Sequence, residues 1–174
     1  REKDAIAHID TALAEADAIG DPAVRARASW FQATVYEFLG RAPEAERAMR
    51  ETINQRGVWL GLWEHVTLCG ELGGLLLDRG FAAEVDAWGE RILERVEAPE
   101  ESGQIVHLER VYGLCLKACS KAWTGDTIGA RELMERAKEI LEMSQERGLG
   151  LTSALGYELI VHYESGNYGS EIDE

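Results

Sequence analysis

The sequence predicts an all-α fold built from antiparallel helix pairs, and three observations lead to this prediction. Hydrophobic residues make up 45% of the 174-residue chain and charged residues 29%, which is typical of globular proteins and not of disordered ones. Only 3 prolines stand against long Ala-, Glu- and Leu-rich stretches, and no Val/Ile/Thr-rich segments recur at strand spacing. Glycines flanked by helical patterns also return at nearly constant intervals, which indicates an internal repeat.

Four short turns define that repeat. Their glycines, Gly40, Gly80, Gly125 and Gly166, lie 40, 45 and 41 positions apart. Each glycine follows one segment with helical apolar spacing and precedes another, so the predicted unit is helix, tight turn, helix. The chain is expected to form a single helical domain with a half repeat over 1–20, repeats over about 22–56, 59–98 and 103–148, and a partial repeat over 151–174.

The half repeat over 1–20 is predicted to be the second helix of a pair that lacks its first helix. Ala5, Ile9 and Ala12 occur there at the spacing of the later second helices. Because the array begins and ends inside repeats, and the chain does not start with Met, we expect it to be a piece of a longer protein. The open ends of such an array expose apolar surface, which suggests a homodimer formed through them.

The second helix of each pair carries an apolar stripe along one face. It is clearest after Gly125, where Ala130, Met134, Ala137 and Leu141 follow at steps of four, three and four. Asp126 is the expected N-cap of that helix. The corresponding stripes in the two earlier pairs are Ala45, Met49 and Thr52, and Val85, Gly89 and Ile92.

The first helix of each pair carries a small residue seven positions before its turn glycine. These residues, Ala33, Gly73 and Ala118, allow two helix backbones to approach closely. Prolines agree with the predicted helix starts, because Pro22 follows the N-cap candidate Asp21 and the next proline falls in the first turn of a second helix.

These residues resemble the pattern of the tetratricopeptide repeat (TPR), a family of helix pairs with small, large and glycine residues at fixed positions. The intervals of 40 to 45 residues resemble the longer-repeat type of bacterial signalling and transcriptional regulators. This resemblance implies an α-solenoid, a superhelix of stacked antiparallel helix pairs. The matching residues are Ala33, Tyr36, Gly40, Ala45 and Met49 in one pair, Leu72, Gly73, Leu76 and Gly80 in the next, and Ala118, Gly125, Ala130, Met134 and Ala137 in the third.

The resemblance also implies that the first helices line a concave groove that binds a partner. An aromatic residue assigned to this groove has a second interpretation, as part of the core, if the register is shifted by one residue. The groove positions are Arg27, Trp30, Thr34 and Phe38, then Thr67, Gly70, Gly74 and Leu77, then Tyr112, Cys115, Cys119 and Trp123, and finally Ile160 and Tyr163.

The function predicted from this arrangement is protein–protein interaction. We expect a regulatory scaffold module, the sensory or coupling region of a bacterial signalling or transcriptional regulator, that binds a peptide, a helix or a neighbouring domain of the same chain. The alternative is a helical sensor that binds a small apolar ligand among Trp30, Phe38, Tyr112 and Trp123.

Composition and motifs argue against other classes of function. The formal net charge of -14 disfavours binding to nucleic acid or to anionic membranes, and no apolar stretch is long enough for a membrane span or a signal peptide. Three cysteines are too few for a disulfide framework, so a cytoplasmic protein with reduced thiols is expected. His65 and Cys69 share the spacing of two zinc ligands but lack further ligands. No catalytic motif or phosphate loop is present, so we expect no enzyme activity, no metal and no cofactor in this segment.

Overall fold

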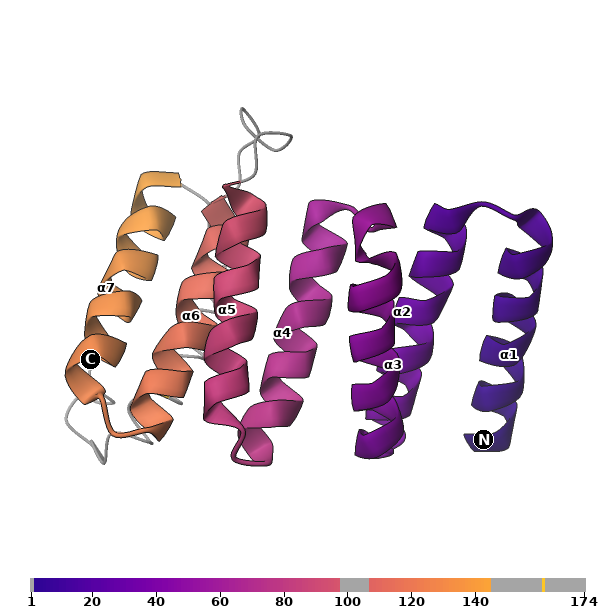
Figure 1. Cartoon of the computed structure of the whole chain (residues 1–174), viewed down its shortest axis with the longest axis horizontal. Coiled ribbons are helices and arrows are strands. Elements are labelled where there is room, and N and C mark those ends of the chain that lie inside the picture. The colour runs from indigo at the N-terminus through magenta and orange to yellow at the C-terminus, as the bar shows by residue number, and fades with distance from the viewer. Residues whose placement is uncertain (1, 98–106, 145–160, 162–174) are drawn as a thin grey trace. The chain divides into compact units, whose positions relative to one another are not determined.

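A computed structural model describes residues 2–97, 107–144 and 161, and these residues are all-α, as predicted from the sequence (Figure 1). Within these ranges the chain forms seven α-helices and one short 3-10 helix, η1, and contains no β-strand. The helices in order are α1 (Glu2–Ile19), α2 (Pro22–Phe38), α3 (Ala42–Arg56), η1 (Gly57–Trp59), α4 (Leu62–Asp78), α5 (Ala82–Val96), α6 (His107–Trp123) and α7 (Thr127–Ser144).

The helices fall into two compact units, which divide between Leu75 and Leu76 inside α4. In the first unit α2 packs against both α1 and α3, and in the second α6 packs against both α5 and α7. Among the described helices, none is both long enough and apolar enough to cross a bilayer.

The turn between α2 and α3 is a Schellman motif centred on Gly40. The backbone N–H of Gly40 donates to the carbonyl of Glu37 at 2.8 Å, and that of Arg41 donates to the carbonyl of Tyr36 at 2.9 Å. The φ angle of Gly40 is 70°, a left-handed conformation that only glycine adopts without a steric penalty. The two bonds satisfy carbonyls that the end of α2 would otherwise leave unpaired.

The same two backbone hydrogen bonds recur at the other predicted turns for which the structure describes the backbone. Gly80 and Gly125 have φ angles of 79° and 86° and close the turns between α4 and α5 and between α6 and α7. At all three turns the residue after the glycine also accepts the first hydrogen bond of the following helix. The helix–turn–helix unit is therefore confirmed three times, while Gly166 lies outside the described residues.

Helix lengths are also repeated. The first helices α2, α4 and α6 each contain 17 residues, and the second helices α3 and α5 each contain 15. Ten residues separate Val96, the end of α5, from His107, the start of α6, whereas five residues separate Arg56 of α3 from Leu62 of α4. This difference accounts for the change in glycine spacing from 40 to 45 residues.

The predicted caps form as expected. The Asp21 carboxylate accepts the backbone N–H of Ala23 at 2.8 Å, and Pro22 is the first residue of α2. The Asp126 carboxylate accepts the backbone N–H of Gly129 at 3.0 Å at the start of α7.

The apolar stripes of the second helices are buried, and so are the small residues of the first helices, Ala33, Gly73 and Ala118. One stripe needs correction. In α1 the buried residues are Ile9, Leu13 and Ala16, whereas Ala12 is exposed. The step of four from Ile9 places the larger Leu13 against α2, where it removes more apolar surface from water than Ala12 would.

The backbones of α5 and α6 approach closely at two glycines. A Cβ atom on Gly89 would lie 2.9 Å from the Gly113 carbonyl oxygen and 2.6 Å from the Lys117 Cγ. Nearby, the buried Ser120 hydroxyl donates to the Ala82 carbonyl at 2.7 Å. The small residue of the weaker stripe on α5, Gly89, therefore permits direct backbone contact between α5 and α6.

Gly89→Ala is expected to destabilise the protein by roughly 1 kcal/mol. Alanine gains about 1 kcal/mol in helix propensity, but its methyl group collides with a backbone carbonyl that cannot move away freely, at a cost of about 1–3 kcal/mol. The control is Gly74→Ala, because a Cβ on Gly74 meets no atom within 4 Å. Urea unfolding should show the control gaining up to about 1 kcal/mol. Equal stabilisation of both variants would contradict the close packing.

Candidate functional site

One side of α2 carries three aromatic residues, which we call the aromatic face of α2: the half-buried Trp30 and the exposed Phe31 and Phe38. The Phe31 side chain is 56% exposed and that of Phe38 is 86% exposed. The rings of Trp30 and Phe31 stack with their centroids 5.3 Å apart. Phe31 and Phe38 lie seven positions apart and share one side of the helix, with Arg27 and Thr34 between and beside them.

Hydrogen bonds link this side of α2 to α4. The Trp30 Nε1–H donates to Glu71 Oε2 at 3.2 Å, and the Thr34 hydroxyl donates to the same oxygen at 3.5 Å. Farther along, the Arg27 guanidinium pairs with Glu64 Oε1 at 2.7 Å. Two first helices thus lie side by side through polar contacts made by predicted groove residues.

Glu64 also helps to start α4. Its Oε2 accepts the backbone N–H of Gly61 at 2.8 Å, which is the bond that a Glu in the first turn makes in a capping box. The same carboxylate therefore fixes the beginning of α4 and binds Arg27 of α2.

Two partly buried carboxylates lie beside the aromatic face. Burial raises the pKa of Glu71 above its usual value of 4.5, while the hydrogen bonds from Trp30 and Thr34 lower that pKa and the negative charge of Glu37 raises it. Burial also raises the pKa of Glu37. The site therefore holds two like charges that water solvates only in part.

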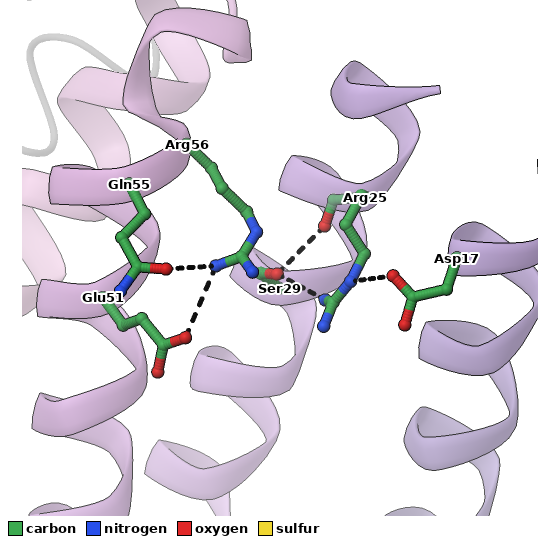
Figure 2. Close-up of polar contacts among 6 residues, drawn as sticks. All are labelled: Asp17, Arg25, Ser29, Glu51, Gln55 and Arg56. Atoms are coloured by element: carbon green, nitrogen blue, oxygen red, sulfur yellow. Dashed lines mark hydrogen bonds and ion pairs between the residues drawn. The ribbon is translucent and has the colours of Figure 1, made fainter. Parts of the chain in front are cut away.

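A second polar network holds the opposite side of α2 (Figure 2). The Arg25 Nε–H donates to Asp17 of α1 at 2.6 Å, and the buried Ser29 hydroxyl donates to the Arg25 carbonyl at 2.9 Å. A separate group of contacts lies within α3, where Arg56 pairs with Glu51 at 3.5 Å and donates to Gln55 at 3.4 Å. By helical spacing, Arg25 and Ser29 lie about opposite to Thr34 and Phe38, so these contacts leave the aromatic face uncovered.

The predicted groove residues differ in where the structure places them. Arg27 and Phe38 are exposed, and Trp30 and Thr34 are half-buried beside Glu71. Farther along α4, Gly74 is exposed and the remaining positions are half-buried or buried, namely Thr67, Gly70 and Leu77.

In α6 of the second unit, two of the four predicted groove residues lie in the core. Cys115 and Cys119 are fully buried, so neither side chain is open to a partner in this structure. The reason is that both face the side of α6 that also buries Val111 and Ala122. Tyr112 is half-buried and Trp123 is 43% exposed. Ile160 and Tyr163 lie outside the described residues.

The sequence reasoning missed four residues of the site: Phe31, Glu37, Glu64 and Glu71. Acidic residues are so frequent in this chain that a single glutamate does not stand out in the sequence. A signal was nevertheless present, since Glu71 follows Trp30 by 41 positions, which is one repeat interval. Residues one interval apart on first helices are the ones that meet when two pairs stack.

Metal-binding groups are not assembled in the described parts of the chain. No cluster of three or more His, Cys, Asp or Glu side chains is arranged there to hold a metal ion. His65 and Cys69 are both buried in α4, and none of the three cysteines forms a disulfide.

Glu71→Gln is expected to raise the melting temperature near neutral pH. The amide keeps an oxygen that accepts from Trp30 but removes the cost of burying a charge. Because the Glu71 pKa is higher in the folded than in the unfolded state, the folded state binds more protons, and the wild-type protein gains stability as the pH falls. The advantage of the variant should therefore shrink between about pH 7 and about pH 4.

Thermal unfolding followed by circular dichroism at both pH values measures this difference. Glu139→Gln, at an exposed position of α7, is the matched control and should change the melting temperature little at either pH. An advantage of Glu71→Gln that is the same at both pH values would show that desolvation of the carboxylate is not its cause.

In comparisons with protein-family models, with curated proteins and with solved structures, the chain matches none of them. Statements about its function therefore rest on the sequence and on the geometry of the described residues.

Proposed function

We propose that the chain is a protein-interaction module of the TPR type, an α-solenoid in which first helices bind a peptide or helix of a partner or a neighbouring domain of the same chain. Two features support this proposal. Helix pairs with the same Schellman turn occur three times. The first helices α2 and α4 are joined through side chains one repeat interval apart.

The observation that carries the proposal is the exposure of Phe31 and Phe38 on the aromatic face of α2. Each exposed Å² of apolar surface costs about 25 cal/mol relative to burial, and aromatic side chains are frequent anchors of interfaces. An open helix face suits a protein segment better than a small apolar ligand, since pockets enclose most of a small ligand's surface.

The wider role is part of the same proposal. We place the module in the cytoplasm, as the sensory or coupling region of a bacterial signalling or transcriptional regulator, without catalytic activity of its own. The three cysteines form no disulfide, which fits a reducing compartment. The net charge of -14 fits a partner other than nucleic acid.

Phe38→Ala is expected to weaken the binding of a partner peptide at least about tenfold, because it removes an exposed anchor without touching the core. The peptide is obtained by selecting a displayed library of random short peptides on the 174-residue chain. Its Kd is then measured by isothermal titration calorimetry for the wild type and for the variant.

Ile128→Ala is the matched control, because Ile128 is a 73% exposed apolar residue on α7 and is not part of the aromatic face of α2. It should leave the Kd unchanged, and circular dichroism should show equal helicity for all three proteins. Failure of the library to yield any binding peptide would refute the proposed function. Equal effects of both variants would remove the aromatic face as its site.

A further inference from the structure

The basic residues near the aromatic face of α2 are already paired with other acidic groups. Arg27 binds Glu64, and Arg41 binds Glu44 at 2.6 Å. In the described part of the chain, no basic side chain forms an ion pair with Glu37 or Glu71. Within the described residues, the two partly buried carboxylates beside the exposed rings therefore have no basic partner.

Glu71 presents one oxygen to such a cation. Both hydrogen bonds that it accepts, from Trp30 and from Thr34, end on Oε2. No described residue donates to Oε1. The Trp30 and Thr34 bonds hold the carboxylate in place, so a partner donor meets an oxygen that is already positioned.

Carboxylates next to aromatic rings favour arginine among the basic side chains. The guanidinium group has five N–H donors in one plane, stacks on aromatic rings and is less strongly hydrated than the lysine ammonium group. This chain contains the same combination within itself, because Arg41 lies over the Tyr36 ring at 5.0 Å while it binds Glu44. Another arginine, Arg91, lies 4.3 Å from the centre of the Trp88 ring.

Resting on the proposed function, we infer that the partner is a basic segment that places an arginine between Glu37 and Glu71 and an apolar side chain against Phe31 and Phe38. The charge of the chain supports this choice of occupant. At a net charge of -14, a second copy of the chain is repelled, whereas a basic segment is attracted and guided to the site.

The test is a double-mutant cycle with a peptide from the library selection. Enriched peptides should contain arginine. Replacing that arginine by citrulline, its neutral isostere, should weaken binding to the wild type at least about tenfold. Glu71→Gln and Glu37→Gln should each weaken binding of the arginine peptide, and the citrulline peptide should bind the wild type and Glu71→Gln equally.

Glu139→Gln removes the same charge at an exposed site on α7 and should change the Kd less than about twofold. Each variant is checked for wild-type helicity by circular dichroism. Enriched peptides without basic residues, or equal effects of Glu71→Gln and Glu139→Gln, would overturn the arginine inference and leave the proposed function standing. A library without any binding peptide would overturn the proposed function itself. Self-association of the chain that the peptide displaces would identify a second copy as the occupant and also overturn the inference.

Discussion

The left-handed glycine at the end of each first helix is the constraint on which the rest of the structure depends. With φ near +70° to +86°, Gly40, Gly80 and Gly125 reverse the chain within a single turn, and two backbone hydrogen bonds close each reversal. The next helix begins two residues after each glycine, so the connection between the two helices of a pair is short and hydrogen-bonded. The apolar stripes of the second helices and the small residues of the first helices are buried in all three pairs.

The polar contacts of the first unit extend this order from one pair to the next. Glu71 and Glu64 of α4 bind side chains of α2, and Arg25 ties the other side of α2 to α1. Such contacts affect the orientation of α2 more than the stability of the fold, since partly exposed ion pairs contribute only about 0–1 kcal/mol. They orient α2 so that its rings remain at the surface. If α2 were held by apolar packing alone, burial of the Phe31 and Phe38 rings would favour a rotation of the helix that turns them toward the core.

Most of the fold could be predicted from the sequence because its causes are local. The turn glycines, the caps Asp21 and Asp126 and the stripes at steps of three and four each act within about one or two helical turns. The stripe of α1 was misplaced at Ala12 because α1 has a partner helix on one side only in the described unit, and the choice between Ala12 and Leu13 depends on that packing. Whether the pairs stack into a solenoid is a long-range property that these local signals do not determine.

The candidate site was less predictable because it depends on contacts between helices that are far apart in the sequence. Trp30 and Thr34 were identified from the repeat register, but their partner Glu71 is one charge among 32 acidic residues, and only the pairing of α2 with α4 distinguishes it. Cys115 was predicted to line the groove but is buried. A residue pattern within one helical turn does not show which sides of a helix the neighbouring helices cover. The burial of Cys115 follows from the packing of α6 between α5 and α7.

The equal helix lengths and the shared turn residue have a consequence for how such a chain can vary. An inserted or deleted residue within a pair would break the Schellman bonds or rotate a stripe by about 100° away from its partner. The two complete intervals differ in length between the end of α5 and the start of α6, which lie ten residues apart, whereas α3 and α4 lie five residues apart. Length variation among homologous chains, and tolerated loop insertions in engineered ones, should therefore be concentrated at the links between pairs and be rare at the glycine turns.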